Sequence, residues 1–298
     1  MKTLAQKFKA FIFLASLLAM TSCFKRETRT VASGGQAPSS DSPVRWSSSS
    51  LSGGLNLRPS DAIINEFNPA DDIDGKNPVQ QMLVQWNNST TSGIQFFKED
   101  PTATADITST NLDDYRNDGV LGIYKSDDWL TGVSSQALAV TQYVGTVQNS
   151  GSPNEYIQLS HADIIMNYRD YNFSTDSSNG NAYDFHSVIL HELGHFIGLG
   201  HVNSFSTPSV MQPYLGISDS VRAITIYDQS NIQSLYGLSS LSSPVVLSSL
   251  IQTKESTGQI RLPSGAKELS NGLVIGLIEL RKNGECLHYE NGKLINSH

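Results

Sequence analysis

The spacing of apolar residues predicts three helices in the middle of the chain. Asn77 suits an N-cap and Pro78 suits the first helical position, and "NNSTTSG" ends the helix that they begin. A second helix is expected over about 184–198, and a third from near Asp228 to Gly237, where glycine favours a helix end. The apolar face of the first helix recurs at i, i+3, i+4 and i+7, at Val79, Met82, Leu83 and Trp86.

Short runs of β-forming residues predict strands between these helices. They cover 93–97, 121–126, 137–147 and 162–168, and the turn-forming "NSGSP" between the last two predicts an antiparallel pair. Further along, "LVIGLIELRKNGECLHYENGKLI" has Asn283-Gly284 between β-rich runs, which is typical of a hairpin. The whole pattern favours an α+β domain followed by a small C-terminal β appendage.

The N-terminus has the pattern of an export signal. Lysines in "MKTLAQKFKA" precede the apolar run "FIFLASLLAM", which is too short to span a bilayer stably. The run ends in "LAMTSC", which resembles the lipobox of bacterial lipoproteins and implies cleavage before Cys23 and acylation of that residue. The expected location is the bacterial cell envelope, on a lipid anchor, and Phe24 in place of a retaining aspartate favours the outer membrane. The alternative is ordinary secretion, with Cys23 as part of the leader.

Composition divides the chain into four parts. Residues 1–22 are the expected signal peptide, and residues 23–42, rich in Ser, Gly and Pro, are the expected lipidated cysteine and flexible tether. Residues 43–240 form the expected main domain. "SSLSSPVVLSS" then begins a linker and a small β-rich segment over 241–298, whose role the sequence does not indicate.

The bulk numbers restrict the partners of the protein. A formal charge of −8 argues against a nucleic-acid ligand, which normally binds a basic face. Separately, we expect the protein to be a monomer. If Cys23 is acylated, the second cysteine, Cys286, has no partner within the chain. Stability must then come from the apolar core and from any bound metal.

Three of the seven histidines stand close together in "HELGHFIGLGH". His191 and His195 leave one face of a helix about one turn apart, and Gly198 lets the backbone turn so that His201 can return as a third ligand. Three imidazoles suit a tetrahedral zinc ion whose fourth position holds water, as in catalytic zinc sites. Glu192, beside the first histidine, can reach that water.

The spacing H-E-x-x-H-x-x-G-x-x-H resembles the metzincin metallopeptidases, and Met211 in "SVMQP" is similar to their methionine-containing turn. "PVQQMLVQW", "ADIIMNY" and "YDQSNIQSLYG" make the resemblance strongest to the matrixins, in their short bacterial form, over roughly residues 43–240. It implies a twisted mixed sheet, three helices and a Met-turn that forms an apolar floor beneath the metal ligands.

The resemblance implies a zinc-dependent metalloendopeptidase that acts on proteins or peptides. One catalytic Zn²⁺ would be held by His191, His195 and His201, and Glu192 would be the general base for a zinc-activated water. The substrate would lie extended along the edge of the sheet.

Several features differ from the animal matrixins. No His/Asp-rich segment suggests a structural zinc, no cysteine-containing propeptide motif is found, and Tyr214 stands one residue before the position of their pocket-wall tyrosine. Residues 176–184, "DSSNGNAYD", have two interpretations, a Ca²⁺ loop or an ordinary loop.

Two other functions fit parts of the sequence. One is a lipid-anchored binding or envelope protein with a vestigial zinc site, although the presence of Glu192 favours the peptidase. The other is an adhesin or envelope-assembly factor whose function lies in residues 245–298.

Overall fold

The fold is described from a computed structural model, which describes residues 42–90, 93–202, 206–217, 219–238, 272–282, 284 and 286–297. The expected signal peptide, Cys23 and nearly all of the tether lie outside these residues, as do most of the expected linker and Asn283. The side chain of Cys286 also lies outside the description. In the part of the chain that is described, no helix has both the length and the apolar character needed to cross a membrane.

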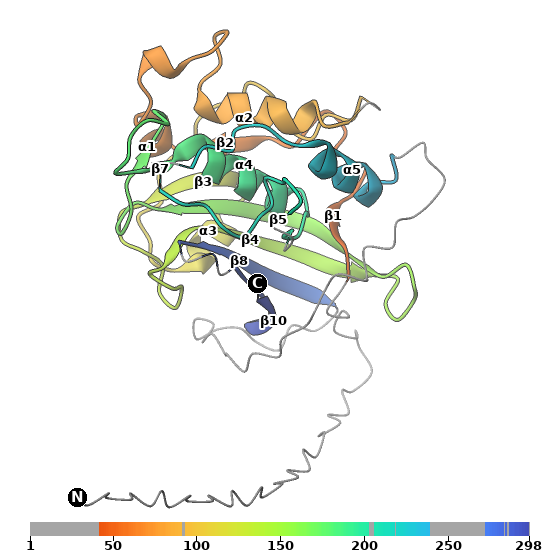
Figure 1. Cartoon of the computed structure of the whole chain (residues 1–298). Helices are drawn as coiled ribbons and strands as arrows, with labels where there is room; N and C mark the ends of the chain where they lie inside the picture. Colours follow the sequence, from red (N-terminus) through yellow and green to blue (C-terminus); the bar gives the residue numbers. More distant parts are fainter. Residues whose placement is uncertain are drawn as a thin grey trace, which may run out of the picture. The chain divides into compact units, whose positions relative to one another are not determined.

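One mixed sheet is the framework of the described residues (Figure 1). Its strands follow the order β10-β9-β8-β4-β5-β3-β2, and β1 pairs in parallel with the start of β5. The pairs β2–β3 and β3–β5 are parallel, whereas β4–β5 is antiparallel, as the turn between them predicts. The strands are β1 (Val44–Trp46), β2 (Leu57–Pro59), β3 (Leu121–Ser126), β4 (Ala137–Gln148), β5 (Tyr156–Asn167), β8 (Leu273–Arg281), β9 (Cys286–Glu290) and β10 (Lys293–Ser297). A separate two-stranded pair joins β6 (Phe173–Ser174) and β7 (Tyr183–Asp184).

The three predicted helices are α2 (Pro78–Asn87), α4 (Phe185–Phe196) and α5 (Ile226–Leu235). Asn77 caps α2 with a full capping box, which confirms the predicted start. The start of α5 lies two residues before the predicted one, because Thr225 is the N-cap and Asp228 is the third helical residue. Three short helical elements were not predicted, α1 (Asp61–Ile64), η1 (Pro69–Asp71) and α3 (Leu112–Arg116), and neither were the short strands β1, β2, β6 and β7.

The predicted strand over 93–97 is wrong. The structure has only an isolated bridge there, between Leu55 and Phe97. Gly93 adopts a φ of +72°, which does not continue a strand, and the amide of Phe97 donates to the side chain of Asn87 instead of to a neighbouring strand. The apolar residues of this run contribute to the core instead, since Phe96 and Phe97 are fully buried there.

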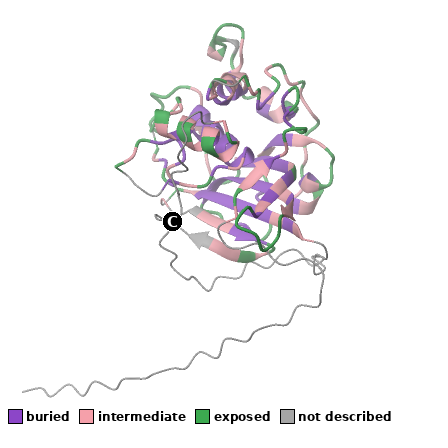
Figure 2. Ribbon diagram, turned by 90° about the vertical axis from the view of Figure 1, so that its right-hand side faces the viewer, coloured by how far each residue is buried: buried purple, intermediate pink, exposed green. Residues whose placement is uncertain are grey.

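Two cores lie on opposite faces of the sheet, since neighbouring residues of a strand point to opposite sides. Ile123 and Ile164 join the larger core, which also contains residues of α2 and α4, whereas Tyr124 and Ile165 join a smaller one with residues of α3. The strands of the sheet are accordingly mostly buried (Figure 2). Helices α2 and α4 are fastened together where Trp86 Nε1 donates to the carbonyl of Leu190 at 2.9 Å.

The C-terminal strands continue the main sheet. β8 pairs antiparallel with β4 along nearly its whole length, and β9 and β10 follow as successive hairpin strands. The turn between β9 and β10 has Asn291 and Gly292 at φ values of +48° and +75°, as two-residue hairpin turns require.

The free energy of unfolding is expected to depend on pH through Glu290 in β9. Burial raises the pKa of its carboxyl from 4.5 to about 7, and a hydrogen bond from Tyr143 opposes this shift. The folded chain therefore retains a proton that the unfolded chain releases, and stability that is present below pH 4.5 is lost as the pH rises through 7. Because glutamine stays neutral, Glu290→Gln should lessen this loss by about 1–3 kcal/mol in urea unfolding at a series of pH values.

Asp72→Asn, at an exposed aspartate, is the control and should leave the wild-type pH dependence unchanged. The comparison is repeated in a His288→Gln background, because His288 Nε2 lies 3.6 Å from the Glu290 carboxylate. Equal pH dependence of wild type and Glu290→Gln in both backgrounds would contradict the assignment.

Candidate metal centre

Helix α4 brings two histidines and one glutamate into the interior. All of its twelve residues are buried, including His191, Glu192 and His195. Asp184 is the N-cap, and its carboxylate accepts from the amide of Ser187 at 3.0 Å and from the Ser187 hydroxyl at 2.6 Å. The helix is therefore held at its start by a charged cap and along its length by burial.

The imidazole rings of His191 and His195 converge with that of His201, which follows the helix. The Nε2 atoms of His195 and His201 lie 2.9 Å and 3.3 Å from Nε2 of His191. Nδ1 of His191 contacts the carbonyl of Val210 at 2.8 Å, and Nδ1 of His195 contacts the carbonyl of Leu199 at 2.8 Å. A carbonyl can only accept, so both Nδ1 atoms carry the proton and both Nε2 atoms turn a lone pair toward the common point.

This donor set fits a cation. Neutral imidazoles whose lone pairs face each other at such distances repel unless a positive ion lies between them. Burial lowers the pKa of His191 to about 4, so this ring is neutral at pH 7, as a ligand must be. The three rings could thus hold one metal ion, and nitrogen ligands are those that zinc prefers.

The turn after α4 depends on Gly198, which adopts a φ of +96° as the sequence predicts. Its amide donates to the carbonyl of His195 at 2.8 Å and ends the helix. The place where a side chain would begin is filled by β1, because a Cβ there would lie 1.9 Å from the carbonyl oxygen of Val44. Glycine is thus required by both conformation and space, and the turn directs the chain toward His201.

The Met-turn, defined here as residues 209–213, lies beneath α4. Met211 is 1% exposed, and a Cβ at Gly194 would lie 2.2 Å from its sulfur. The thioether of Met211 therefore packs against α4 at Gly194, where the helix has no side chain. The amide of Val202 donates to the carbonyl of Met211 at 2.8 Å, which ties the segment after His201 to the same turn.

Asp228 of α5 fixes the Met-turn. Its buried carboxylate accepts from the hydroxyl of Ser209, from the amide of Val210 at 3.1 Å, and from the amide and hydroxyl of Thr225 at 2.8 Å and 2.9 Å. The carbonyl of Val210 in turn orients His191. Asp228 therefore acts on the metal site indirectly, through Val210 and His191.

Asp228→Asn is expected to lower both stability and zinc affinity. An amide offers one acceptor oxygen and turns an N–H₂ group toward donors, so we expect a loss of about 2–4 kcal/mol in unfolding free energy. Zinc affinity should fall about 10–100-fold, because His191 loses its orientation. Urea unfolding and competitive zinc titration measure the two effects.

The matched control is Asp219→Asn, at an exposed aspartate whose carboxylate accepts from the amide of Gly216. This variant should bind zinc as wild type does. If Asp228→Asn also bound zinc with wild-type affinity, the link from α5 through the Met-turn to His191 would be refuted.

Glu192 is fully buried beside the histidines. Its Oε2 accepts from the hydroxyl of Thr141 on β4 at 2.5 Å, and its buried Oε1 has no hydrogen-bond partner within the described chain. Burial raises the pKa of Glu192 to about 8, and the bond from Thr141 opposes this shift. A cation held by the neighbouring imidazoles would favour the carboxylate and lower that pKa.

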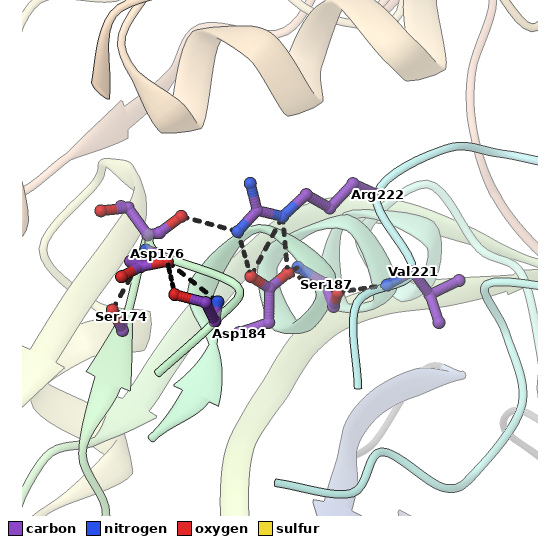
Figure 3. Close-up of polar contacts among 8 residues, drawn as sticks. Ser174, Asp176, Asp184, Ser187, Val221 and Arg222 are labelled. Carbon is purple, nitrogen blue, oxygen red and sulfur yellow. Dashed lines mark hydrogen bonds and ion pairs between the residues drawn. The ribbon is translucent and has the colours of Figure 1, made fainter. Parts of the chain in front are cut away.

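A pocket opens beside His191 and is lined by Ser187, the Met-turn, Tyr214, Leu215, Val221 and Leu280. Val221 lines this pocket, and Val221 and its neighbour Arg222 are bonded to the start of α4 (Figure 3). The Arg222 guanidinium binds the Asp184 carboxylate through Nε at 3.0 Å and also through Nη2, which donates to the carbonyl of Thr175 at 2.6 Å. The amide of Val221 donates to the hydroxyl of Ser187 at 2.7 Å. Residues 221 and 222 are therefore bonded directly to the start of α4.

The Ca²⁺ interpretation of residues 176–184 gains no support. The carboxylate of Asp176 accepts from the amide and hydroxyl of Ser178, and that of Asp184 binds Arg222 (Figure 3). No group of side chains able to hold a metal includes this loop, among the residues that the structure describes.

A second polar cluster, which the histidine spacing does not indicate, joins Asp118, His161 and Asp163. Each carboxylate in it already accepts from protein groups: Asp163 from the amide of Gly122 and the Gln142 side chain, and Asp118 from Tyr124.

The structure thus brings the predicted histidines, Glu192 and Met211 together, while Cys23 lies outside the description. Sequence reasoning missed three contributors: Thr141, the carbonyl of Val210, and Asp228 as an anchor. Only the last had a usable pattern, since Thr225 and Asp228 form a capping box that the sequence "TIYD" contains.

Three converging imidazoles, two of them on the same helix as a buried carboxyl group, could hold one metal ion next to an acid–base group. The model of the Peptidase_M10 family, matrixin, matches residues 62–237, and the chain belongs to this family of zinc-dependent peptidases. The matched range contains all three histidines, Glu192 and Met211, and it ends before β8. No curated protein matches the chain.

Proposed function

We propose that the protein is a zinc metalloendopeptidase in which His191, His195 and His201 hold the metal and Glu192 is the general base. The observation that carries this proposal is the convergence of three Nε2 atoms beside a buried carboxyl group with one unpartnered oxygen. Membership of the matrixin family supports it. A bound zinc ion supplies Lewis acidity to a scissile carbonyl and makes a bound water acidic near neutral pH.

Glu192 has the position for proton transfer. Its Oε1 can accept the proton of an attacking water and then give it to the leaving amine nitrogen. The hydroxyl of Thr141 holds Oε2, so that only one carboxylate oxygen is left for this work. The carbonyls of Val210 and Leu199 keep two ligand rings in the tautomer that binds metal.

Removing the metal tests the proposal. The purified chain should contain stoichiometric zinc at neutral pH and cleave an unfolded protein such as casein; 1,10-phenanthroline should abolish cleavage, and added Zn²⁺ should restore it. His201→Ala should lose zinc and cleavage together, because three protein ligands are needed. His161→Ala, at a histidine outside the triad, is the control and should retain both. Zinc-free protein that still cleaves casein would sink the proposal.

The alternative, a binding or envelope protein with a vestigial zinc site, is not favoured, because Glu192 and all three histidines are in place. It predicts stoichiometric zinc with no cleavage. The cell-envelope location, the acylation of Cys23 and the monomeric state stay predictions, and so do the four domain boundaries.

A further inference from the structure

The edge of β4 nearest the metal centre is covered by another strand of the same chain. β4 reaches Glu192 through Thr141, and the residue of β8 opposite Thr141 is Ile278. β8 runs antiparallel to β4 from the pair Thr146–Leu273 to the pair Ala137–Arg281. β8 is therefore paired with this edge of β4 from Ala137 to Thr146, on both sides of Thr141.

The side chains of β8 divide between the two faces of the sheet. Val274, Ile278 and Leu280 enter the larger core together with residues of α4, whereas Leu277 enters the smaller core on the other face. Leu280, which is 1% exposed, also lines the pocket beside His191. One aliphatic side chain of β8 is thus placed at the pocket that adjoins a metal ligand.

Two described residues that follow β8 are also held in place. A Cβ at Gly284 would lie 2.9 Å from Cδ2 of Tyr214, so Gly284 packs directly on the ring of that pocket residue. The amide of Lys282 donates to the carbonyl of Gln136 at 3.1 Å. The end of β8 is therefore fixed both at Tyr214 and at the residue that precedes β4.

An extended peptide that joins a sheet edge and inserts alternate side chains into pockets is a general mode of peptide binding. β8 is paired with β4 in this way, and a second peptide cannot pair with the same edge at the same time. The segment also lies outside residues 62–237, which the matrixin model matches.

We propose that residues 273–281 are an intramolecular inhibitor that occupies the β4 edge in place of a peptide substrate and contributes Leu280 to the wall of the His191 pocket. This inference rests on the proposed peptidase function. Leu280 lines that pocket where a substrate side chain would enter it. The active form of the protein is the one in which β8 has left β4.

A cut in the connection between β8 and the rest of the chain tests the proposal. A recognition sequence for a site-specific protease is inserted between residues 238 and 272 of the full chain, and the folded protein is cut there. Release of the C-terminal piece is followed by size-exclusion chromatography, and kcat/KM is measured on a short quenched peptide with leucine at the cleavage site. We expect release to raise kcat/KM about tenfold or more, because a docked segment leaves only a minor fraction of chains open.

A synthetic peptide covering residues 272–297 should reverse this rise when it is added back, and the same peptide with Leu280→Ala should reverse it far less. In the uncut chain, Leu280→Ala should raise kcat/KM, whereas Leu287→Ala, at a half-buried leucine of β9 that does not line the pocket, should not. This pair of variants decides the question even if the cut piece stays bound. Loss of activity on release, or equal kcat/KM for Leu280→Ala and wild type, overturns the proposal.

A binding measurement separates this inference from the peptidase function. In zinc-loaded Glu192→Gln, a fluorescent substrate peptide should bind the cut and released chain more tightly than the uncut chain. Tighter binding without turnover in any wild-type form would refute the peptidase and support occupancy by β8. Turnover that is unchanged by release would refute the inhibitor and leave the peptidase standing.

Discussion

Glu192→Gln is expected to retain zinc and to lower kcat/KM by about 10²–10⁴-fold. Glutamine has the size of glutamate and its amide oxygen can still accept from Thr141, so the buried site should keep its packing. An amide cannot take a proton from water and return it to an amine, so proton transfer is lost. The comparison uses the form of the chain that turns over fastest, cut or uncut, with zinc measured by atomic absorption.

Two further variants sharpen this test. Glu66→Gln, at an exposed glutamate that binds Lys125, should have wild-type kcat/KM. Glu192→Asp keeps the carboxylate but withdraws it by one methylene, and its kcat/KM should lie between those of wild type and Glu192→Gln. Full turnover by Glu192→Gln with stoichiometric zinc would show that another group moves the proton.

Gly198→Ala is expected to lower the free energy of unfolding by about 3–5 kcal/mol. The new methyl group would lie 1.9 Å from the carbonyl oxygen of Val44 and must also tolerate a φ of +96°. Val44 cannot easily yield, since β1 is paired with β5. Displacement of the turn should also move His201 and weaken zinc binding, so urea unfolding and zinc titration should change together.

Two other glycines separate the causes. Gly237→Ala also places alanine at a positive φ, +67°, but in open space, so it should show the conformational cost alone, about 1 kcal/mol. Gly200→Ala has open space and no left-handed backbone, and its stability should be near that of wild type. If Gly198→Ala cost no more than Gly237→Ala, the contact with Val44 would have no energetic weight.

The sequence predicted those features that depend on interactions between residues close together in the chain, such as helix starts and the spacing of side chains on one helix face. Asn77 and Pro78 mark the start of α2 because capping involves only the first turn of a helix. The positions of His191, His195 and Gly198 follow from helix periodicity and from the conformational range of glycine, and the structure has these features. The fold class and the resemblance to the matrixins are confirmed by the mixed sheet and the family match.

Contacts between distant segments could not be predicted in this way. Thr141 meets Glu192 across 51 residues, and nothing in a strand marks which threonine will face a helix. The pairing of β8 with β4 is decided by which edge of the sheet is free, a property of the whole fold. The run over 93–97 has the composition of a strand, but the neighbouring backbone does not supply a continuous ladder.

The place of β1 bears on how the protein should be produced for experiment. Trp46 Nε1 donates to the carbonyl of Phe196 at 2.8 Å, and the amide of Trp46 donates to the hydroxyl of Tyr236 at 3.2 Å. Recombinant fragments trimmed to residues 62–237 would lack this strand and leave the end of α4 exposed to water. Expression should therefore begin no later than residue 42, well upstream of the family boundary.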